Sequence, residues 1–230
     1  LTLQVKGLAA HVGRPLALIA ESDLNDPRIV RHLDAGGYGI DAQWSDDFHH
    51  ALHTSLTGEN KGYYEDYDGL PSLAKAIAET FVYTGQYVPS RGRVHGRATG
   101  GLSADRFLAY LQNHDQIGNR ATGERIGHLV DLRRVKLGAG IVLTSPYVPM
   151  LFMGEEWAAS TPFQYFTSFA DKALGEAVSK GRRSEFGSFG WKPEDVPDPQ
   201  DPKTFERSKL RWDEIGRGEH PEVLRWHKEL

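Results

Sequence analysis

Residues 16–21 read Leu-Ala-Leu-Ile-Ala-Glu, an apolar run that follows Pro15 and ends directly at a carboxylate. A continuous apolar run without polar alternation is typical of a strand buried on both faces of a parallel sheet. We therefore expect a strand over residues 16–20, with Glu21 at its carboxyl end. In parallel-sheet enzymes ligands bind at that end of the strands, which makes Glu21 a candidate functional residue.

The same arrangement of an apolar run followed by polar residues occurs three more times, with segments of helical period between the runs. The further strands are expected at residues 38–44, 106–112 and 148–153. The helices are expected at residues 48–56, 70–82 and 132–143. Strands that alternate with helices indicate an α/β fold with a parallel sheet. Residues 86–101 lack any period, which predicts a long loop.

Composition excludes several classes of function. The 230 residues contain no cysteine, so disulfides, thiolate metal sites and cysteine nucleophiles are excluded, and a reducing cytoplasm is the expected location. The formal net charge of -4 gives no positive excess for nucleic acid or an anionic membrane, and neither is expected as a partner. The most apolar stretch, residues 141–153, is broken by Pro146 and Pro149 and is too short to span a bilayer.

The position of Glu21 suggests acid chemistry. A carboxyl group beside desolvated apolar surface has a raised pKa, which is the state a general acid requires near neutral pH. A surface carboxylate beyond the strand end, or a helix cap, is the structural alternative, and the residue alone does not decide between them.

A second polar cluster follows the run at residues 106–112. Residues 113–119 read Asn-His-Asp-Gln-Ile-Gly-Asn, a dense set of hydrogen-bonding groups suited to the hydroxyls of a sugar. The alternative is a capped loop in which Asp115 accepts backbone N–H groups.

Other chemistries have weaker support. His49 and His53 have the i, i+4 spacing of zinc helices, but the glutamate of the His-Glu-x-x-His motif is absent and no third ligand is evident, so we expect no metal. The glycine-rich residues 92–101 lack the Gly-Lys-Ser/Thr ending of a phosphate-binding loop, and no Gly-x-Ser-x-Gly elbow occurs.

Four segments carry a resemblance to a known family. Residues 18–26, Leu-Ile-Ala-Glu-Ser-Asp-Leu-Asn-Asp, resemble the fifth-strand acid motif of the alpha-amylase superfamily of glycoside hydrolases, and residues 113–116 resemble its seventh-strand Asn-His-Asp motif. Together with residues 41–50 and 150–157, in this order, they resemble most specifically the members that release trehalose from maltooligosyltrehalose. The resemblance covers about residues 15–212.

The resemblance implies a fold and a set of roles. Residues 1–230 would be the C-terminal half of a (β/α)8 TIM barrel, strands five to eight with their helices, cut at both ends, so that the upstream half and a C-terminal β-domain lie outside. Glu21 would be the general acid/base, and Asp115 the third carboxylate that orients the sugar and stabilises the transition state. No cofactor is implied, and the substrate would be an α-glucan oligosaccharide. Residues implied to contact it are Asp46, Asp47, Phe48, His49, His50, His114, Gln116, Ile117, Gly118 and Asn119.

The nucleophile is the piece that the resemblance does not supply. A retaining glycosidase needs a second carboxylate about 5 to 5.5 Å from the acid. In the superfamily it is an Asp of the fourth strand, upstream of the acid, and residues 1–20 contain no Asp or Glu. We therefore expect the nucleophile outside this sequence, with residues 1–12 as the end of the fourth helix.

Three alternatives stay open at this point. The first is another enzyme of the superfamily, a branching or amylase-type enzyme that acts on α-glucans. The second is a carbohydrate-binding module without catalysis. The third, with less support, is a metal-dependent hydrolase. The reaction products would distinguish the first alternative from the leading interpretation. Replacement of Glu21 by glutamine would distinguish the second, and a chelator would distinguish the third.

Overall fold

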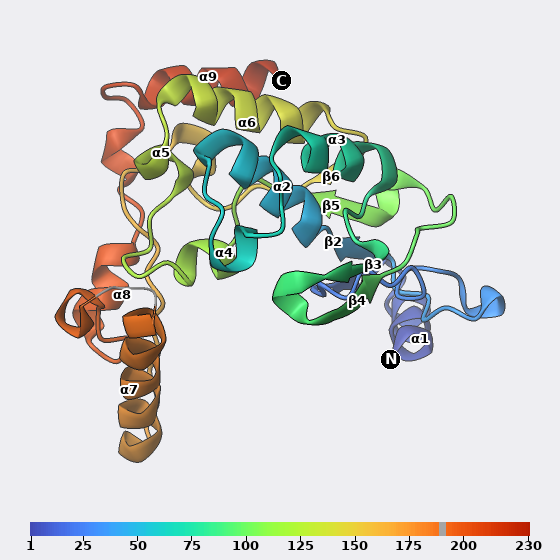
Figure 1. Ribbon diagram of the computed structural model, residues 1–230, viewed down its shortest axis with the longest axis horizontal. Coiled ribbons are helices and arrows are strands. Elements are labelled where there is room, and N and C mark those ends of the chain that lie inside the picture. The colour runs from blue at the N-terminus through green and yellow to red at the C-terminus, as the bar shows by residue number, and fades with distance from the viewer. Residues whose placement is uncertain (189–191) are drawn as a thin grey trace. The chain divides into compact units, whose positions relative to one another are not determined.

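The computed structural model describes residues 1–188 and 192–230 and divides into two compact units (Figure 1). The first unit comprises Leu1–Leu111 with Gly140–Met150, and the second comprises Gln112–Ala139 with Leu151–Leu230. All strands of the described ranges belong to the first unit.

A four-stranded parallel sheet organises the first unit, as the sequence predicts. Its strands, in spatial order, are β1 (Ile19–Ala20), β2 (Ala42–Trp44), β5 (Phe107–Ala109) and β6 (Val148–Pro149). Their register pairs Ile19 with Ala42, Gln43 with Phe107, and Leu108 with Val148. The strands lie side by side in chain order and all run the same way, so their carboxyl ends share one edge.

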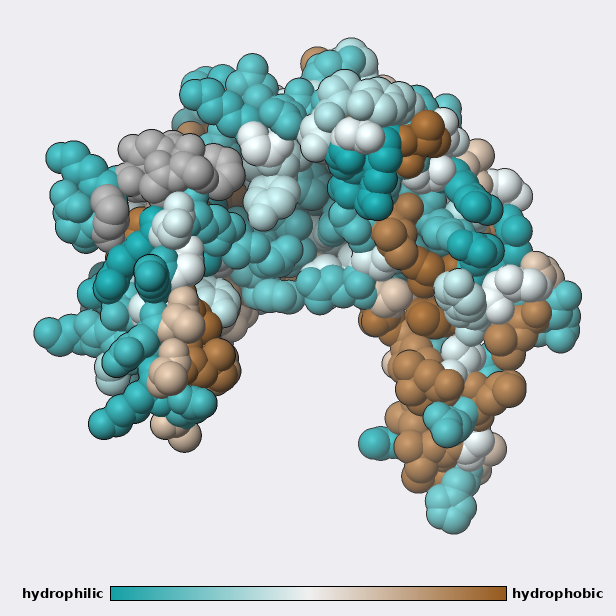
Figure 2. All heavy atoms as spheres, turned by 60° about the horizontal axis from the view of Figure 1, so that its bottom comes forward, coloured by the Kyte–Doolittle hydropathy of each residue, from teal (hydrophilic) through white to brown (hydrophobic). Residues whose placement is uncertain are grey.

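β1 is an edge strand in this chain, so the apolar run at residues 16–20 is not buried on both faces here. In the part of the chain that the structure describes, β1 pairs only with β2, and Ile19 is 52% exposed. Hydrophobic side chains gather over α1 (Thr2–Val12) and β1, at the lower right of Figure 2. The exposed members are Leu1, Leu3, Leu8, Val12 and Ile19.

Two helices of the first unit follow the sequence expectation closely. α2 (Asp46–Thr57) begins directly after β2, where the Ser45 hydroxyl accepts a 3.4 Å hydrogen bond from the Phe48 N–H. Two acidic residues in its first turn complement the positive end of the helix dipole. α3 (Leu70–Glu79) packs against α2. The cap and the acidic turn together fix where α2 starts at the edge of the sheet.

The segment expected as a long loop is instead an antiparallel hairpin. Strands β3 (Thr84–Val88) and β4 (Arg93–Gly96) pair across a turn of 3-10 helix at Pro89–Arg91. Gly96 has a φ of +75°, and a Cβ there would lie 1.9 Å from the Tyr83 carbonyl oxygen, so only glycine fits. Backbone hydrogen bonds between the two strands hold this segment in a regular structure, although its sequence shows no hydrophobic period.

The second unit is helical. Its helices are α4 (His114–Gly118), α5 (Ile126–Leu129), α7 (Lys172–Ser188), α8 (Pro202–Ser208) and α9 (His220–Glu229). α6 (Leu132–Thr144) begins in this unit and ends in the first. α9 is tied to α6 by a 2.8 Å hydrogen bond from Trp226 Nε1 to the Lys136 carbonyl. Within residues 1–188 and 192–230, none of the helices has the length and apolar character needed to span a membrane.

Candidate active site

Glu21 is exposed at the carboxyl end of β1. Among the strands of the described ranges β1 pairs with β2 alone, so this chain by itself does not bury the carboxyl group. The segment that starts at Glu21 is anchored at the next residue. The side-chain amide of Gln43, fully buried on β2, donates a 2.9 Å hydrogen bond to the Ser22 carbonyl. A neighbouring strand therefore fixes the backbone beside the candidate acid.

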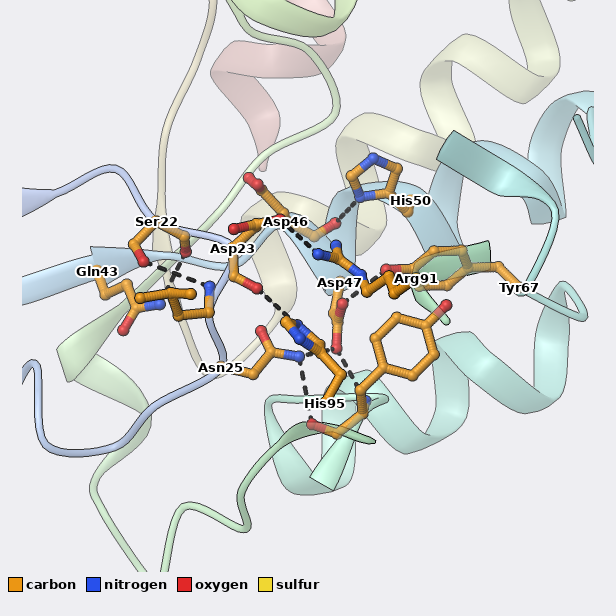
Figure 3. Close-up of polar contacts among 12 residues, drawn as sticks. Ser22, Asp23, Asn25, Gln43, Asp46, Asp47, His50, Tyr67, Arg91 and His95 are labelled. Atoms are coloured by element: carbon orange, nitrogen blue, oxygen red, sulfur yellow. Dashed lines mark hydrogen bonds and ion pairs between the residues drawn. The ribbon is translucent and has the colours of Figure 1, made fainter. Parts of the chain in front are cut away.

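The hairpin holds Asp23 in two places (Figure 3). Arg91 Nη1 lies 2.8 Å from Asp23 Oδ2, and the His95 ring donates to the Asp23 carbonyl at 2.8 Å. Partial burial acts to raise the pKa of Asp23, but the hydrogen bond and charge of Arg91 outweigh it and bring the pKa below its ordinary value. Burial and the charge of Arg91 lower the pKa of His95, which favours the neutral ring. The β3–β4 hairpin thus fixes the position of Asp23, which lies two residues after Glu21.

Asp47 connects the same segment to the rest of the unit. Its buried carboxylate accepts hydrogen bonds from Asn25 Nδ2 (2.7 Å) and the Tyr67 hydroxyl (2.6 Å). It also accepts from the backbone N–H groups of Val82 (2.6 Å) and Tyr83 (3.1 Å). Burial, with the charge of Asp47, raises the pKa of Tyr67 well above its ordinary value, so this hydroxyl keeps the proton it donates. Because it accepts from four donors, the carboxylate of Asp47 is part of an internal hydrogen-bond network.

Asp46 is half-buried, whereas the other residues of positions 46–50 are buried. The Tyr110 hydroxyl donates a short hydrogen bond to Asp46 Oδ1, and the His50 ring lies 2.6 Å from the Asp46 carbonyl oxygen. Burial raises the pKa of Asp46, and the hydrogen bond from Tyr110 opposes that shift. Asp46 is therefore the member of this group best placed to reach a ligand.

The other residues of the first turns of α2 lie inside the protein. Phe48 is completely buried, and His49 stacks on Tyr110 with ring centroids 5.4 Å apart. Burial, with the charges of His50 and His53, lowers the pKa of His49 well below its ordinary value, so the ring is neutral. No group of three His, Cys, Asp or Glu side chains that could hold a metal ion occurs in the described ranges.

Asp115 lies in the second unit, in the first turn of α4. The Asn113 side chain caps this helix, accepting from the Asp115 N–H (2.9 Å) and the Gln116 N–H (3.0 Å). The capping function considered for Asp115 thus belongs to Asn113. The Asp115 carboxylate is exposed and accepts a 2.6 Å hydrogen bond from Asn119 Nδ2. His114 is also exposed, whereas Ile117 and Gly118 are buried.

The predicted residues divide between the two units. Glu21 and residues 46–50 belong to the first unit, and residues 114–119 belong to the second. The residues that support those of the first unit were not predicted from the sequence, and they are Asn25, Tyr67, Arg91 and His95. A signal for the last two was present. Strand-favouring residues at 86–88 and 93–95 flank the turn Pro-Ser-Arg-Gly, a pattern typical of a hairpin.

Relatives with known names match nearly the whole chain. A "Malto-oligosyltrehalose trehalohydrolase" from Mycobacterium tuberculosis is 48% identical over 225 residues, covering 97% of this chain and 39% of the relative. The protein of that name from Arthrobacter ramosus is 49% identical over 234 residues, covering 100% and 40%. The one from Saccharolobus solfataricus is 48% identical over 195 residues, covering 85% and 34%. The chain thus spans about two fifths of the length of the curated relatives it matches.

A solved structure matches the fold. A crystal structure of a Salmonella typhimurium protein assigned as an alpha amylase superposes with a TM-score of 0.84 at 38% sequence identity. The match covers 98% of this chain and 39% of that one. No family model matches the chain. The similarity therefore extends over both units but over a limited part of each longer protein.

Proposed function

Because the chain is homologous along nearly its whole length to part of the malto-oligosyltrehalose trehalohydrolases, we propose that it belongs to a retaining glycoside hydrolase that releases trehalose. The substrate is maltooligosyltrehalose, and the bond cleaved is the α-1,4 bond next to the trehalose unit. The observation that carries the proposal is 48% identity over 225 residues, together with an exposed carboxylate directly after β1. A cytoplasmic location is part of the proposal and is supported by the cysteine-free composition.

Glu21 is the general acid/base in this mechanism. In the first step its carboxyl group protonates the glycosidic oxygen of the departing trehalose. In the second step the carboxylate that remains takes a proton from the water that hydrolyses the glycosyl-enzyme. The supports at Ser22, Asp23 and Asn25 suit this role, because proton transfer requires the acid to be held within hydrogen-bond reach of the bond.

Asp115 is the carboxylate that orients the sugar hydroxyls. Its exposure and its hydrogen bond to Asn119 leave acceptor capacity for hydroxyl donors. We assign direct substrate contact to the residues with exposed or half-buried polar side chains and to His50, next to Asp46. Asp47, Phe48, His49, Ile117 and Gly118 are assigned to the support of these groups, since they are buried. The residues assigned to direct contact are Asp46, His50, His114, Gln116 and Asn119.

The four parallel strands are proposed to be strands five to eight of a (β/α)8 barrel. Their sequential order in the sheet and the amylase-type match support this assignment. The nucleophilic aspartate is then supplied by the part of the relatives' length that this chain does not span, since residues 1–20 contain no carboxylate. The complete enzyme is this chain together with that remainder.

Product analysis tests the proposal. The complete enzyme is incubated with maltooligosyltrehalose, and the sugars are separated and identified by chromatography. We expect free trehalose and the shortened maltooligosaccharide, with the activity lost in Glu21→Gln. The matched control is Glu79→Gln, the same charge change at an exposed residue of α3, which keeps the activity. Maltooligosaccharides or α-1,6 branches formed from starch, without trehalose release, would contradict the proposed specificity.

A further inference from the structure

Glu155 is a buried carboxyl group of the second unit to which the proposed mechanism gives no role. It opens the 3-10 helix Glu155–Trp157, and only 1% of it is exposed. Its Oε2 accepts from Gln112 Nε2 at 3.2 Å and from the Phe152 N–H at 3.4 Å. Its Oε1 is buried and has no hydrogen-bond partner within the described ranges. Both donors thus address one oxygen, which leaves the other as the place for a proton.

The Gln112 side chain is held at both ends. Its amide nitrogen donates to Glu155, and its amide oxygen accepts a 2.8 Å hydrogen bond from the Ile126 N–H at the start of α5. The next residue is Asn113, whose side chain caps α4 and thereby sets the position of Asp115. A continuous set of contacts therefore runs from Glu155 through Gln112 to the backbone that carries Asp115.

The charges around Glu155 favour its neutral form. Burial raises the pKa of Glu155 from its ordinary value of 4.5 to about 8; the hydrogen bonds from Phe152 and Gln112 oppose this, and Glu156 adds to it. The charge of Arg125 also opposes the rise in pKa, and its Nε and Nη1 donate to the carbonyls of Thr161 (2.7 Å) and Met153 (2.9 Å). Burial lowers the pKa of Arg125 itself to about 10, so it stays charged at neutral pH, with Glu214 as a further neighbouring charge.

We propose that Glu155 is a positioning residue for Asp115, which it holds in place through Gln112 and Asn113. The inference rests on the proposed function for the role of Asp115. Ionisation gives Oε1 a buried negative charge without a donor, so the charged form favours an opened segment in which water reaches the carboxylate. The folded pKa is raised, so the stabilisation is complete below 4.5 and is lost as the pH rises to about 8.

Hydrogen exchange at the Ile126 amide reports on this contact without any substrate. We measure its protection in the complete enzyme from pH 6 to 9.5, corrected for the intrinsic exchange rate. In the wild type we expect protection to fall by up to about tenfold for each pH unit between 6 and 8 and to level off above 8. Glu155→Gln, neutral at every pH and of the same shape, keeps its protection. The control Glu156→Gln, half-buried one residue away, keeps a fall of protection with pH, since Glu155 still titrates in it.

Kinetics separate positioning from simple stability. Glu155→Ala is expected to lower kcat by about 10- to 100-fold with little change in KM, because Asp115 is misplaced in the transition state. Glu155→Gln restores kcat and extends activity to higher pH than the wild type. Gln112→Ala is a second variant, which keeps Glu155, removes the contact to Ile126 and loses kcat in the same way.

Two results would overturn the inference. One is an Ile126 protection profile in Glu155→Gln that falls with pH as the wild type does. The other is full kcat in Gln112→Ala while the Ile126 amide is released. The exchange measurement does not depend on catalysis, so it stands even if Glu21→Gln retains activity and the proposed function fails.

Discussion

The side-chain amide of Asn25 donates a 2.7 Å hydrogen bond to the carboxylate of Asp47. This contact joins the segment that begins at Glu21 to the first turn of α2. Asn25 has a left-handed φ of +52°, a conformation that asparagine tolerates better than most residues, and Asp47 holds it there. The candidate acid is exposed, yet four residues later the chain is fixed by a buried network.

Removal of the Asp47 carboxylate is expected to destabilise the first unit. Asp47→Ala removes the acceptor of four hydrogen bonds, three of which point to Oδ2, and the cost is about 2 to 4 kcal/mol. Thermal unfolding followed by circular dichroism measures it as a lowered Tm. Asp34→Ala, whose side chain is 92% exposed, serves as the control and leaves the Tm unchanged. Equal Tm values for the two variants would show that the Asp47 network contributes nothing.

His49 makes stability sensitive to acid. Its folded pKa lies well below the ordinary 6.5, so the unfolded chain binds the proton first. The stabilisation is therefore complete above about 6.5 and is lost as the pH falls below that value. His49→Phe keeps an aromatic ring beside Tyr110 and removes the titration. We expect the difference in Tm between pH 7.5 and 5.5 to be smaller in the variant than in the wild type, and an equal difference would contradict the neutral state of this ring.

The 230 residues by themselves are expected to release no trehalose. Under the proposed function the nucleophile belongs to the remainder of the barrel, so no glycosyl-enzyme can form without it. The exposed apolar residues of α1 and β1 also favour self-association of the isolated chain. A trehalose assay and light scattering test both statements, before and after the remainder is supplied. Trehalose release by residues 1–230 alone would show that the account of the nucleophile is wrong.

The sheet was predictable from the sequence because apolar runs and helical periods report burial directly. The runs that end at Glu21 and before Ser45 became β1 and β2, and the acidic turn at 46–47 starts α2. The lengths of the strands were not predictable, since only two or three residues of each run make ladder hydrogen bonds. The exposure of Glu21 was one of the alternatives that the sequence left open, for a related reason. An apolar run shows that a strand suits a buried place but does not show which strands cover it.

The supports of the site were the least predictable part. Arg91 and His95 contact Asp23 from about 70 positions later in the chain. Contacts at such a sequence separation cannot be predicted from local periodicity. Asp47 was expected to contact a ligand on the strength of the resemblance, and the structure gives its carboxylate four internal donors. The neighbouring carboxylates at 46 and 47 therefore have different surroundings. Successive side chains of a helix point in different directions, and tertiary packing decides what each of them contacts.

The role of Glu21 is tested most directly by comparing two substrates in Glu21→Gln. Maltooligosyltrehalose needs protonation of its leaving oxygen, whereas a maltooligosyl fluoride with an α-fluoride leaving group does not. We predict that kcat/KM of the complete enzyme falls by about 100- to 10,000-fold for the first substrate and far less for the second. Equal losses for both substrates, or no loss for maltooligosyltrehalose, would contradict the assignment of Glu21 as the general acid.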